Sequence, residues 1–256
     1  MQNLTTNATE ILLSARNMQC HYGAVHALRG VDLDLQAGEL FALIGPNGAG
    51  KSTLFAALAG EVPHASGTVK LAGHAIETLS VAQRSAAGLG RSYQTAQVFA
   101  TLSVLDNVNL AMHFSGKMTE NTALDYLQHA GLADYAMDCA GSLSYPNRKR
   151  LDVVLAMAQS PKVLLMDEPT AGLDADSRHA LLSWVKAAAK ARGMGVIFTE
   201  HNMDAVFAFA DRIAVLVRGR IIALGSPAEI ATNEDVRAAY LGENFQIKAN
   251  LQHAAN

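Results

Sequence analysis

The residues with the clearest chemical meaning form a glycine-rich stretch that ends in lysine, serine and threonine. They satisfy the pattern G-x-x-x-x-G-K-S/T and are Gly45, Pro46, Asn47, Gly48, Ala49, Gly50, Lys51, Ser52 and Thr53. Glycine lets main-chain N–H groups turn toward an anion, and a helix that follows adds its positive N-terminal end. In such a loop the lysine reaches the β- and γ-phosphates, and the serine hydroxyl ligates Mg²⁺. The stretch therefore predicts a site for Mg²⁺ and a nucleoside triphosphate.

A second set of polar residues follows two apolar runs further along the chain. Asp167 and Glu168 come directly after Val163–Met166, and His201 closes the segment that begins with Gly195–Phe198. Ligands of open α/β sheets bind at the carboxyl ends of the strands. There Asp167 is placed to hold Mg²⁺, Glu168 to act as general base on a water, and His201 to donate to the γ-phosphate. An acidic pair alone is equally a solvated strand end, but roughly a hundred residues after a phosphate loop it indicates a hydrolytic site.

Apolar runs around these residues predict the elements that hold them in place. Glu39–Ile44 is expected to enter the phosphate loop as a buried strand, and Leu54–Ala59 to leave it as a helix. The runs Val163–Met166 and Gly195–Phe198 are typical of parallel strands covered on both faces. A helix over residues 176–192 joins them and gives a βαβ unit. The predicted fold class is α/β.

Other stretches predict antiparallel pairing beside this core. Residues 31–36 alternate apolar and polar side chains, and residues 66–73 form a short strand between turn signals. Together they suggest an antiparallel β-subdomain. Near the end of the chain, Ile213–Val217 and Ile221–Leu224 flank residues 218–220 and predict a hairpin.

Between about residues 95 and 160 the periodicity becomes helical. Ser103 can cap a helix over 104–111, a second helix covers Thr122–Ala130, and a third has apolar residues on one face over 151–158. Because the strand-like runs resume after this stretch, we expect a helical subdomain inserted into the α/β core.

Composition limits the class of protein. Half of the 256 residues are hydrophobic and 17% are charged, which is typical of a folded globular chain. A formal net charge of −3 argues against a nucleic-acid partner. No apolar run approaches the roughly 18 residues needed to span a bilayer, so any link to a membrane is expected to go through partner proteins. We predict one domain over 11–243, with polar tails at 1–10 and 244–256.

In this order, the motifs resemble the nucleotide-binding subunit of an ABC transporter over about residues 11–243. The resemblance implies the ABC-type nucleotide-binding domain of the P-loop NTPases, with ATP as the nucleotide. It identifies Glu168 as the catalytic glutamate and His201 as the switch histidine. Tyr22 matches the aromatic residue that stacks on adenine. Gln94 matches the Q-loop glutamine, which reaches Mg²⁺ and relays motion to the membrane subunit.

Two further motifs belong to the dimer interface of that family. Ala171–Asp174 matches the D-loop. The signature, usually Leu-Ser-Gly-Gly-Gln or Leu-Ser-Tyr-Gly-Gln, reads Leu-Ser-Tyr-Pro-Asn over Leu143–Asn147. Ser144 keeps a hydroxyl that can donate to a γ-phosphate, but Pro146 lacks the N–H that binds phosphate in the family. Losing one such donor commonly costs on the order of 10²–10³ in rate.

The altered signature affects the choice of partner. In the family, each ATP lies between the phosphate loop of one chain and the signature of the other. We therefore expect a second ABC ATP-binding subunit as partner, in a heterodimer rather than a homodimer, with one weakened site. A proline in the first turn is compatible with a helix. For Arg148, Lys149 and Arg150 two interpretations stay open: partial electrostatic compensation, or a solvated basic helix face.

Four stretches resemble the ATP-binding subunits of branched-chain amino acid and related amide importers. They are residues 88–94, 102–108, 200–203 and 239–243. The resemblance implies transmembrane permease subunits, a periplasmic or extracellular solute-binding protein acting through them, and a peripheral position on the cytoplasmic face of the inner membrane. Lipopolysaccharide-export ATPases share parts of the pattern and stay an alternative. Because this subunit does not touch the solute, its sequence does not name it.

Three other functions compete with an ATPase that energises an importer. A non-hydrolysing regulatory ATP-binding subunit is motivated by Pro146, although Glu168 argues against complete inactivity. A phosphate-loop kinase gives no reason for the D-loop or His201. A soluble ABC protein of translation or DNA repair usually carries two cassettes or a long coiled-coil insertion, neither of which is in this sequence.

Overall fold

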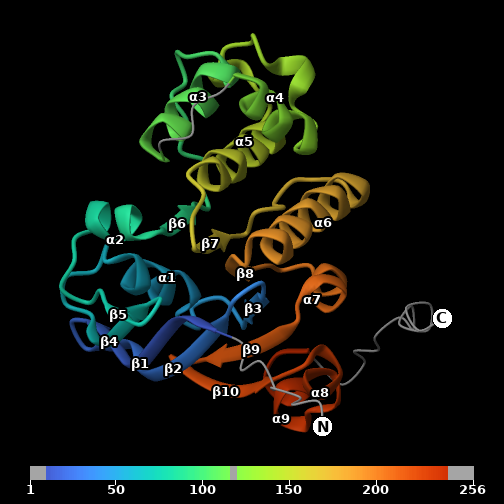
Figure 1. Ribbon diagram of the computed structural model, residues 1–256. Helices are drawn as coiled ribbons and strands as arrows, with labels where there is room; N and C mark the ends of the chain where they lie inside the picture. The colour runs from blue at the N-terminus through green and yellow to red at the C-terminus, as the bar shows by residue number, and fades with distance from the viewer. Residues whose placement is uncertain (1–9, 116–119, 242–256) are drawn as a thin grey trace, which may run out of the picture.

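The computed structural model describes residues 10–115 and 120–241, which form two sheets with helices around them (Figure 1). The polar tails predicted at 1–10 and 244–256 lie outside the described residues, apart from Glu10. In the described part of the chain, no helix has both the length and the apolar character that crossing a membrane requires.

A six-stranded sheet forms the centre of the molecule. Its order is β10-β9-β3-β8-β7-β6, and neighbours are parallel except β9 and β10. The strands are β3 (Leu40–Ile44), β6 (Leu89–Ser92), β7 (Val163–Asp167), β8 (Gly195–Thr199), β9 (Arg212–Val217) and β10 (Arg220–Gly225). The predicted βαβ unit and the β9–β10 hairpin are confirmed. Because β3, β8 and β7 are parallel neighbours, their carboxyl ends lie side by side. The phosphate loop, the acidic pair and His201 therefore lie at the same end of the sheet.

Helices cover the sheet and fill the chain between β6 and β7. They are α1 (Lys51–Ala59), α2 (Val81–Ala87), α3 (Val104–Ser115), α4 (Glu120–His129), α5 (Tyr145–Ala158), α6 (Ala175–Arg192), α7 (Met203–Phe209), α8 (Pro227–Thr232) and α9 (Glu234–Val236), with short turns at Ala133–Tyr135, Ala140–Ser142 and Arg237–Leu241. The predicted helices α3, α4 and α5 pack together at the top of Figure 1. Ser103 caps α3, as expected, by accepting from Asp106 N at 3.0 Å. The subdomain limits near 95 and 160 stay a prediction.

The central sheet is buried because each of its faces has its own hydrophobic core. Every residue of β3, β7 and β8 is buried. Along β3, Leu40 and Ile44 pack into the core formed with α3 to α7, whereas Phe41 and Leu43 pack into the core formed with α1 and the second sheet. This two-sided burial explains why the strands are apolar without alternation.

The second sheet is antiparallel, with the order β2-β1-β4-β5. Its strands are β1 (Ile11–Tyr22), β2 (Val25–Gln36), β4 (Ser66–Leu71) and β5 (His74–Ala75). β2 contains the predicted strand 31–36, and β4 covers the predicted strand 66–73 except for its last two residues. The sequence does not reveal β1, because a register shift between Ala15 and Met18, with Asn17 at φ 49°, breaks the alternation of its side chains.

Candidate active site

The phosphate loop runs from the end of β3 to the start of α1, and two of its glycines are fixed by neighbouring backbone. Gly45 has φ 149° and Gly50 has φ 110°. A Cβ at Gly45 would collide with Leu216 O, and one at Gly50 would lie 2.5 Å from Ala27 O. Gly48, at φ 77°, is required by its conformation alone, since a Cβ there would meet no atom within 4 Å. Neighbouring backbone therefore packs against the loop at Gly45 and Gly50, whereas the loop is open at Gly48.

The start of α1 presents main-chain donors to the loop. Its N-cap is Gly50, which has no side chain to offer, and the hydrogen bond from Leu54 N to Gly50 O measures 2.8 Å. The N–H groups of Lys51, Ser52 and Thr53 consequently have no partner within the helix. Side chains cap α2, α5, α6, α7 and α8 instead. An anion is the partner that such an uncapped helix start can bind.

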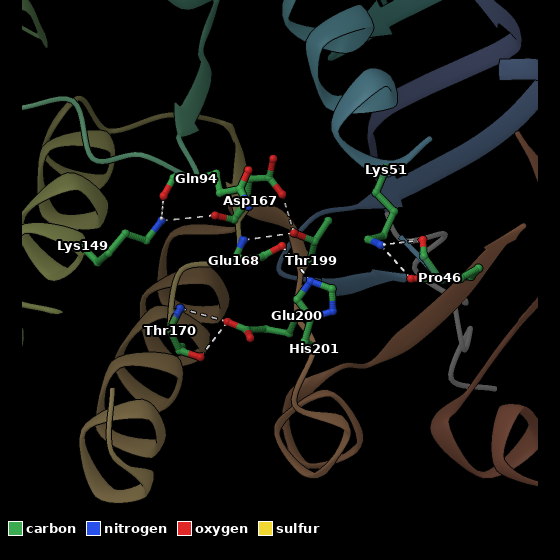
Figure 2. Close-up of polar contacts among 11 residues, drawn as sticks. Pro46, Lys51, Gln94, Lys149, Asp167, Glu168, Thr170, Thr199, Glu200 and His201 are labelled. Atoms are coloured by element: carbon green, nitrogen blue, oxygen red, sulfur yellow. Dashed lines mark hydrogen bonds and ion pairs between the residues drawn. The ribbon is translucent and has the colours of Figure 1, made fainter. Parts of the chain in front are cut away.

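The Lys51 ammonium lies on the same loop. It donates to Gly45 O at 2.7 Å and to Pro46 O at 3.2 Å (Figure 2). Burial lowers the pKa of Lys51, while the charges of Glu168 and Asp167 act to raise it. Lys51 can therefore exchange loop carbonyls for phosphate oxygens.

The predicted acidic pair lies at the end of β7, beside the end of β8. Asp167 is 4% exposed, and its Oδ1 accepts a hydrogen bond from Thr199 Oγ1 at 2.7 Å. The same hydroxyl oxygen accepts from Glu168 N at 3.0 Å. Thr199 thereby orients both acidic residues. Thr199 has no role in the predictions from the sequence, although its position two residues before His201 is a signal that could have found it.

Glu168 and His201 contact one another across the two strands. Glu168 Oε1 lies 2.8 Å from His201 Nε2, with the glutamate side chain 19% and the histidine side chain 48% exposed (Figure 2). Glu168 has φ 49°, a left-handed conformation that non-glycine residues rarely adopt and that is common at functional sites. The structure thus brings together the two residues predicted to activate water and to contact the γ-phosphate.

A buried glutamate next to His201 contacts the residue that precedes the D-loop. Glu200 Oε1 accepts from Thr170 N at 2.9 Å and from Thr170 Oγ1 at 2.7 Å. Burial raises the pKa of Glu200, and both hydrogen bonds act to lower it. Asp174 at the end of the D-loop caps α6 by accepting from Ser177 N at 2.8 Å. Glu200 therefore joins the segment that contains His201 to Thr170, the residue just before the D-loop.

Lys149 corrects one of the sequence interpretations. It is fully buried, so the picture of a wholly solvated basic helix face is wrong for this residue. Its Nζ donates to the carbonyls of Tyr93, Gln94 and Asp167. Burial lowers the pKa of Lys149, and nearby carboxylates, Asp152 first among them, act to raise it. α5 folds back over the end of β7, and this packing buries the lysine.

The Q-loop is also held through its main-chain N–H groups. Asp152 accepts from Tyr93 N at 2.9 Å and from Gln97 N at 2.8 Å. Burial raises the pKa of Asp152 to about 6, against these two hydrogen bonds and the charge of Lys149. Asp152 therefore holds the main chain before and after Gln94, while the side chain of Gln94 is exposed. Sequence analysis assigns no role to Asp152.

Tyr22 lies beside the phosphate loop. It ends β1, is 49% exposed and meets the His64 ring edge to face, with centroids 5.2 Å apart. Desolvation raises the pKa of Tyr22, Cys20 raises it further, and a side-chain contact with Thr53 acts to lower it. The exposed ring is available for stacking of a base.

Ser144 lies apart from these residues, at the start of α5. It caps the helix by accepting from Asn147 N at 3.4 Å, with Pro146 in the first turn, so the expected tolerance of the proline is confirmed. A Cβ on Gly172 would lie 3.3 Å from the Tyr145 ring. The signature and the D-loop, both predicted to face a partner, consequently adjoin each other in this chain.

The donor types at the site suit Mg²⁺. Ser52 offers a hydroxyl, Asp167 a carboxylate and Gln94 an amide oxygen, and hard cations prefer oxygen ligands. Among residues 10–115 and 120–241, no three His, Cys, Asp or Glu side chains form a metal cluster. Mg²⁺ commonly takes one or two protein ligands together with phosphate oxygens, and this chain would share the ion with its nucleotide in that way. When bound, Mg²⁺ neutralises charge that develops on the phosphates.

Comparisons with known proteins agree with this arrangement. The family model described as ABC transporter matches residues 28–171. A second model, described as branched-chain amino acid ATP-binding cassette transporter, matches residues 220–246.

Relatives match over nearly their full length. The high-affinity branched-chain amino acid transport ATP-binding protein LivG of Salmonella typhimurium is 33% identical over 250 residues, covering 91% of this chain and 98% of LivG. The lipopolysaccharide export system ATP-binding protein LptB of Escherichia coli is 32% identical over 239 residues, covering 92% and 99%. A nucleotide-free ATP-binding cassette from an ABC transporter has a TM-score of 0.79 at 26% identity, covering 91% of this chain and 100% of that one. An ADP-bound cassette has a TM-score of 0.78 at 27% identity, covering 92% and 100%.

These likenesses confirm the predicted α/β fold with its antiparallel sheet. The matched region contains the phosphate loop and the acidic pair whose geometry is described above. The chain therefore belongs to the ABC transporter family, as one of its ATP-binding and ATP-hydrolysing subunits.

Proposed function

We propose that this ATPase energises the import of branched-chain amino acids or related small polar solutes. The match of residues 220–246 to the branched-chain amino acid cassettes carries the proposal, because it lies outside the part common to ABC transporters. The identity to LivG supports it. The similar identity to LptB keeps lipopolysaccharide export as the alternative.

Each residue at the edge of the sheet has a role in hydrolysis under this proposal. The main-chain donors of the phosphate loop and Lys51 bind the phosphates of ATP, and Tyr22 stacks on the adenine. Asp167, Ser52 and Gln94 hold Mg²⁺. Glu168 takes a proton from the attacking water, and His201 leaves its contact with Glu168 to donate to the γ-phosphate.

A groove next to the Q-loop is the proposed contact for a permease. It encloses about 240 Å³ and is lined by residues that include Arg91, Tyr93, Gln97, Phe99, Leu110 and Leu155. Phe99 is 58% exposed at this groove. A short amphipathic helix of a membrane subunit can place apolar side chains there. Closure of the cassette then reaches the permease through the Gln94 segment.

The partner arrangement follows from the signature. We infer that Ser144 serves the nucleotide of a second ABC subunit and that Pro146 weakens that composite site. A heterodimer, peripheral on the cytoplasmic face of the inner membrane, gives this chain's own phosphate loop a complete signature. A solute-binding protein acts on the complex indirectly, through the permeases.

Reconstitution tests the proposal. The tagged chain is purified from membranes, its co-eluting subunits are identified, and the complex is placed in proteoliposomes. We expect import of labelled leucine that requires ATP and is lost in a complex with Glu168→Gln. Co-elution of lipopolysaccharide-export subunits would support the alternative, and a complex that binds ATP without hydrolysing it would support a regulatory subunit.

A further inference from the structure

Lys149 makes three hydrogen bonds to main-chain carbonyls at the centre of the site. Its ammonium donates to Tyr93 O at 2.6 Å, Gln94 O at 3.2 Å and Asp167 O at 3.3 Å, and Figure 2 shows the last two. The side chain is fully buried. An ammonium group has three N–H donors, so these carbonyls use its full capacity.

The three acceptors belong to two segments that are far apart in the sequence. Tyr93 and Gln94 follow β6, whereas Asp167 ends β7. These segments carry two of the three side chains proposed to hold Mg²⁺. Lys149, from a third element, therefore connects the main chain of one proposed ligand to the main chain of the other.

A second contact from α5 restricts what Lys149 can hold. Asp152 lies one turn further along the same helix and accepts from Tyr93 N at 2.9 Å and Gln97 N at 2.8 Å. The Q-loop segment is thus attached to α5 by both residues. Lys149 adds a link from this attached segment to Asp167, just beyond the last pair of the β6–β7 ladder, Ser92 with Met166.

We propose that Lys149 is a positioning residue that sets the spacing of Gln94 and Asp167 for Mg²⁺. The inference rests on the proposed roles of those two residues as metal ligands. Burying a charge costs free energy, and an apolar side chain of similar length would avoid that cost. The three carbonyls explain why a lysine is there. Groups that orient metal ligands typically change metal affinity or activity by roughly 10–100-fold when they are removed.

Lys149→Met tests this inference, because methionine has a similar length and no donor. The full-length protein is titrated with fluorescent ATP, once with Mg²⁺ and once with EDTA. We expect the affinity gained from Mg²⁺ to fall by roughly 10–100-fold in the variant, while affinity in EDTA stays near that of the unchanged protein. Lys149→Gln keeps two donors and should give a smaller loss.

Lys186→Met is the matched control. Lys186 also donates to a main-chain carbonyl, that of Phe209 at 2.7 Å, and pairs with Asp211, but none of the three is a proposed metal ligand. The ATP affinity that Lys186→Met gains from Mg²⁺ should equal that of the unchanged protein.

The outcomes separate this inference from the proposed function. An unchanged gain from Mg²⁺ in folded Lys149→Met would overturn the positioning role alone. If the methionine variant does not fold, the glutamine variant decides. If the unchanged protein binds ATP equally with Mg²⁺ and EDTA, the proposed metal site fails and the inference falls with it.

Discussion

Both the amino-acid type of Glu168 and the fixed position of its carboxylate suit it to act on water. Its left-handed backbone and its hydrogen bond to Thr199 direct the carboxylate toward His201. The amino-acid type allows general-base chemistry, and the contact with His201 gives the carboxylate a fixed position before ATP arrives.

Replacing Glu168 by glutamine should abolish most of the turnover without loss of ATP binding. Glutamine has nearly the same shape but cannot take a proton from water, so the hydrolysis rate of the complete complex should fall roughly 10²–10⁴-fold. Phosphate release and ATP titration measure the two effects. Glu229→Gln, at the cap of α8, is the control and should keep its turnover. Equal turnover in the two variants would show that another group is the base.

Asp152 gives the protein a specific dependence of stability on pH. Its pKa is raised from 3.8 to about 6 by burial, so between these values the folded state binds more protons than the unfolded state. The contribution of Asp152 is therefore most favourable at about pH 4 and is lost as the pH rises through about 6. The change amounts to about 3 kcal/mol.

Urea unfolding of Asp152→Asn across pH isolates this contribution. Asparagine does not titrate, and the other groups cancel when the two proteins are compared. The free energy of unfolding of the unchanged protein, relative to the variant, should fall by about 2 kcal/mol between about pH 4 and pH 7. A difference that stays constant over this range would mean that Asp152 is charged in the folded protein throughout.

At the scale of elements, α5 carries the features that distinguish this chain from the usual signature. Ser144 caps the helix, Pro146 lies in its first turn, and Lys149 and Asp152 hold the Q-loop. One helix thus combines a surface predicted to face a partner's nucleotide with contacts to the chain's own site. Movement of α5 would affect the partner-facing surface and the chain's own site together.

Pro146→Gly should restore the missing donor of the signature. The new N–H can donate to the γ-phosphate of the partner's ATP, so turnover at that site should rise on the order of 10²-fold. Single-turnover hydrolysis in the heterodimer, with the partner's phosphate loop intact and this chain's Glu168 changed to glutamine, measures that site alone. Pro146→Ala, which also supplies an N–H, should show part of the gain. No gain in either variant would indicate that the site lacks more than this donor.

At the scale of the whole molecule, the proposed heterodimer makes a prediction about the isolated chain. Two copies of this chain would present two weakened signatures, so ATP hydrolysis by the purified protein should be slower than in the complete complex by on the order of 10²-fold. Steady-state rates over a range of protein concentrations test this. Fast turnover that rises with concentration of this chain alone would contradict the heterodimer.

Local sequence patterns were enough to predict the phosphate loop, the acidic pair and the strands that carry them. These features are local: glycine at fixed spacing sets the turn, and apolar runs identify strands buried on both faces. The same locality explains the failure at β1, where the bulge at Asn17 removes the alternation that marks a strand.

Which residues act together depends on how distant segments pack. Strand order placed Thr199 against Asp167, and the packing of α5 turned Lys149 from an apparent surface residue into a buried link between Gln94 and Asp167. The sequence does not reveal such contacts, because a lysine or threonine has the same local pattern whether it faces water or carbonyls. The difference arises when segments distant in the chain exclude solvent between them, since a buried ammonium must then find its acceptors within the protein.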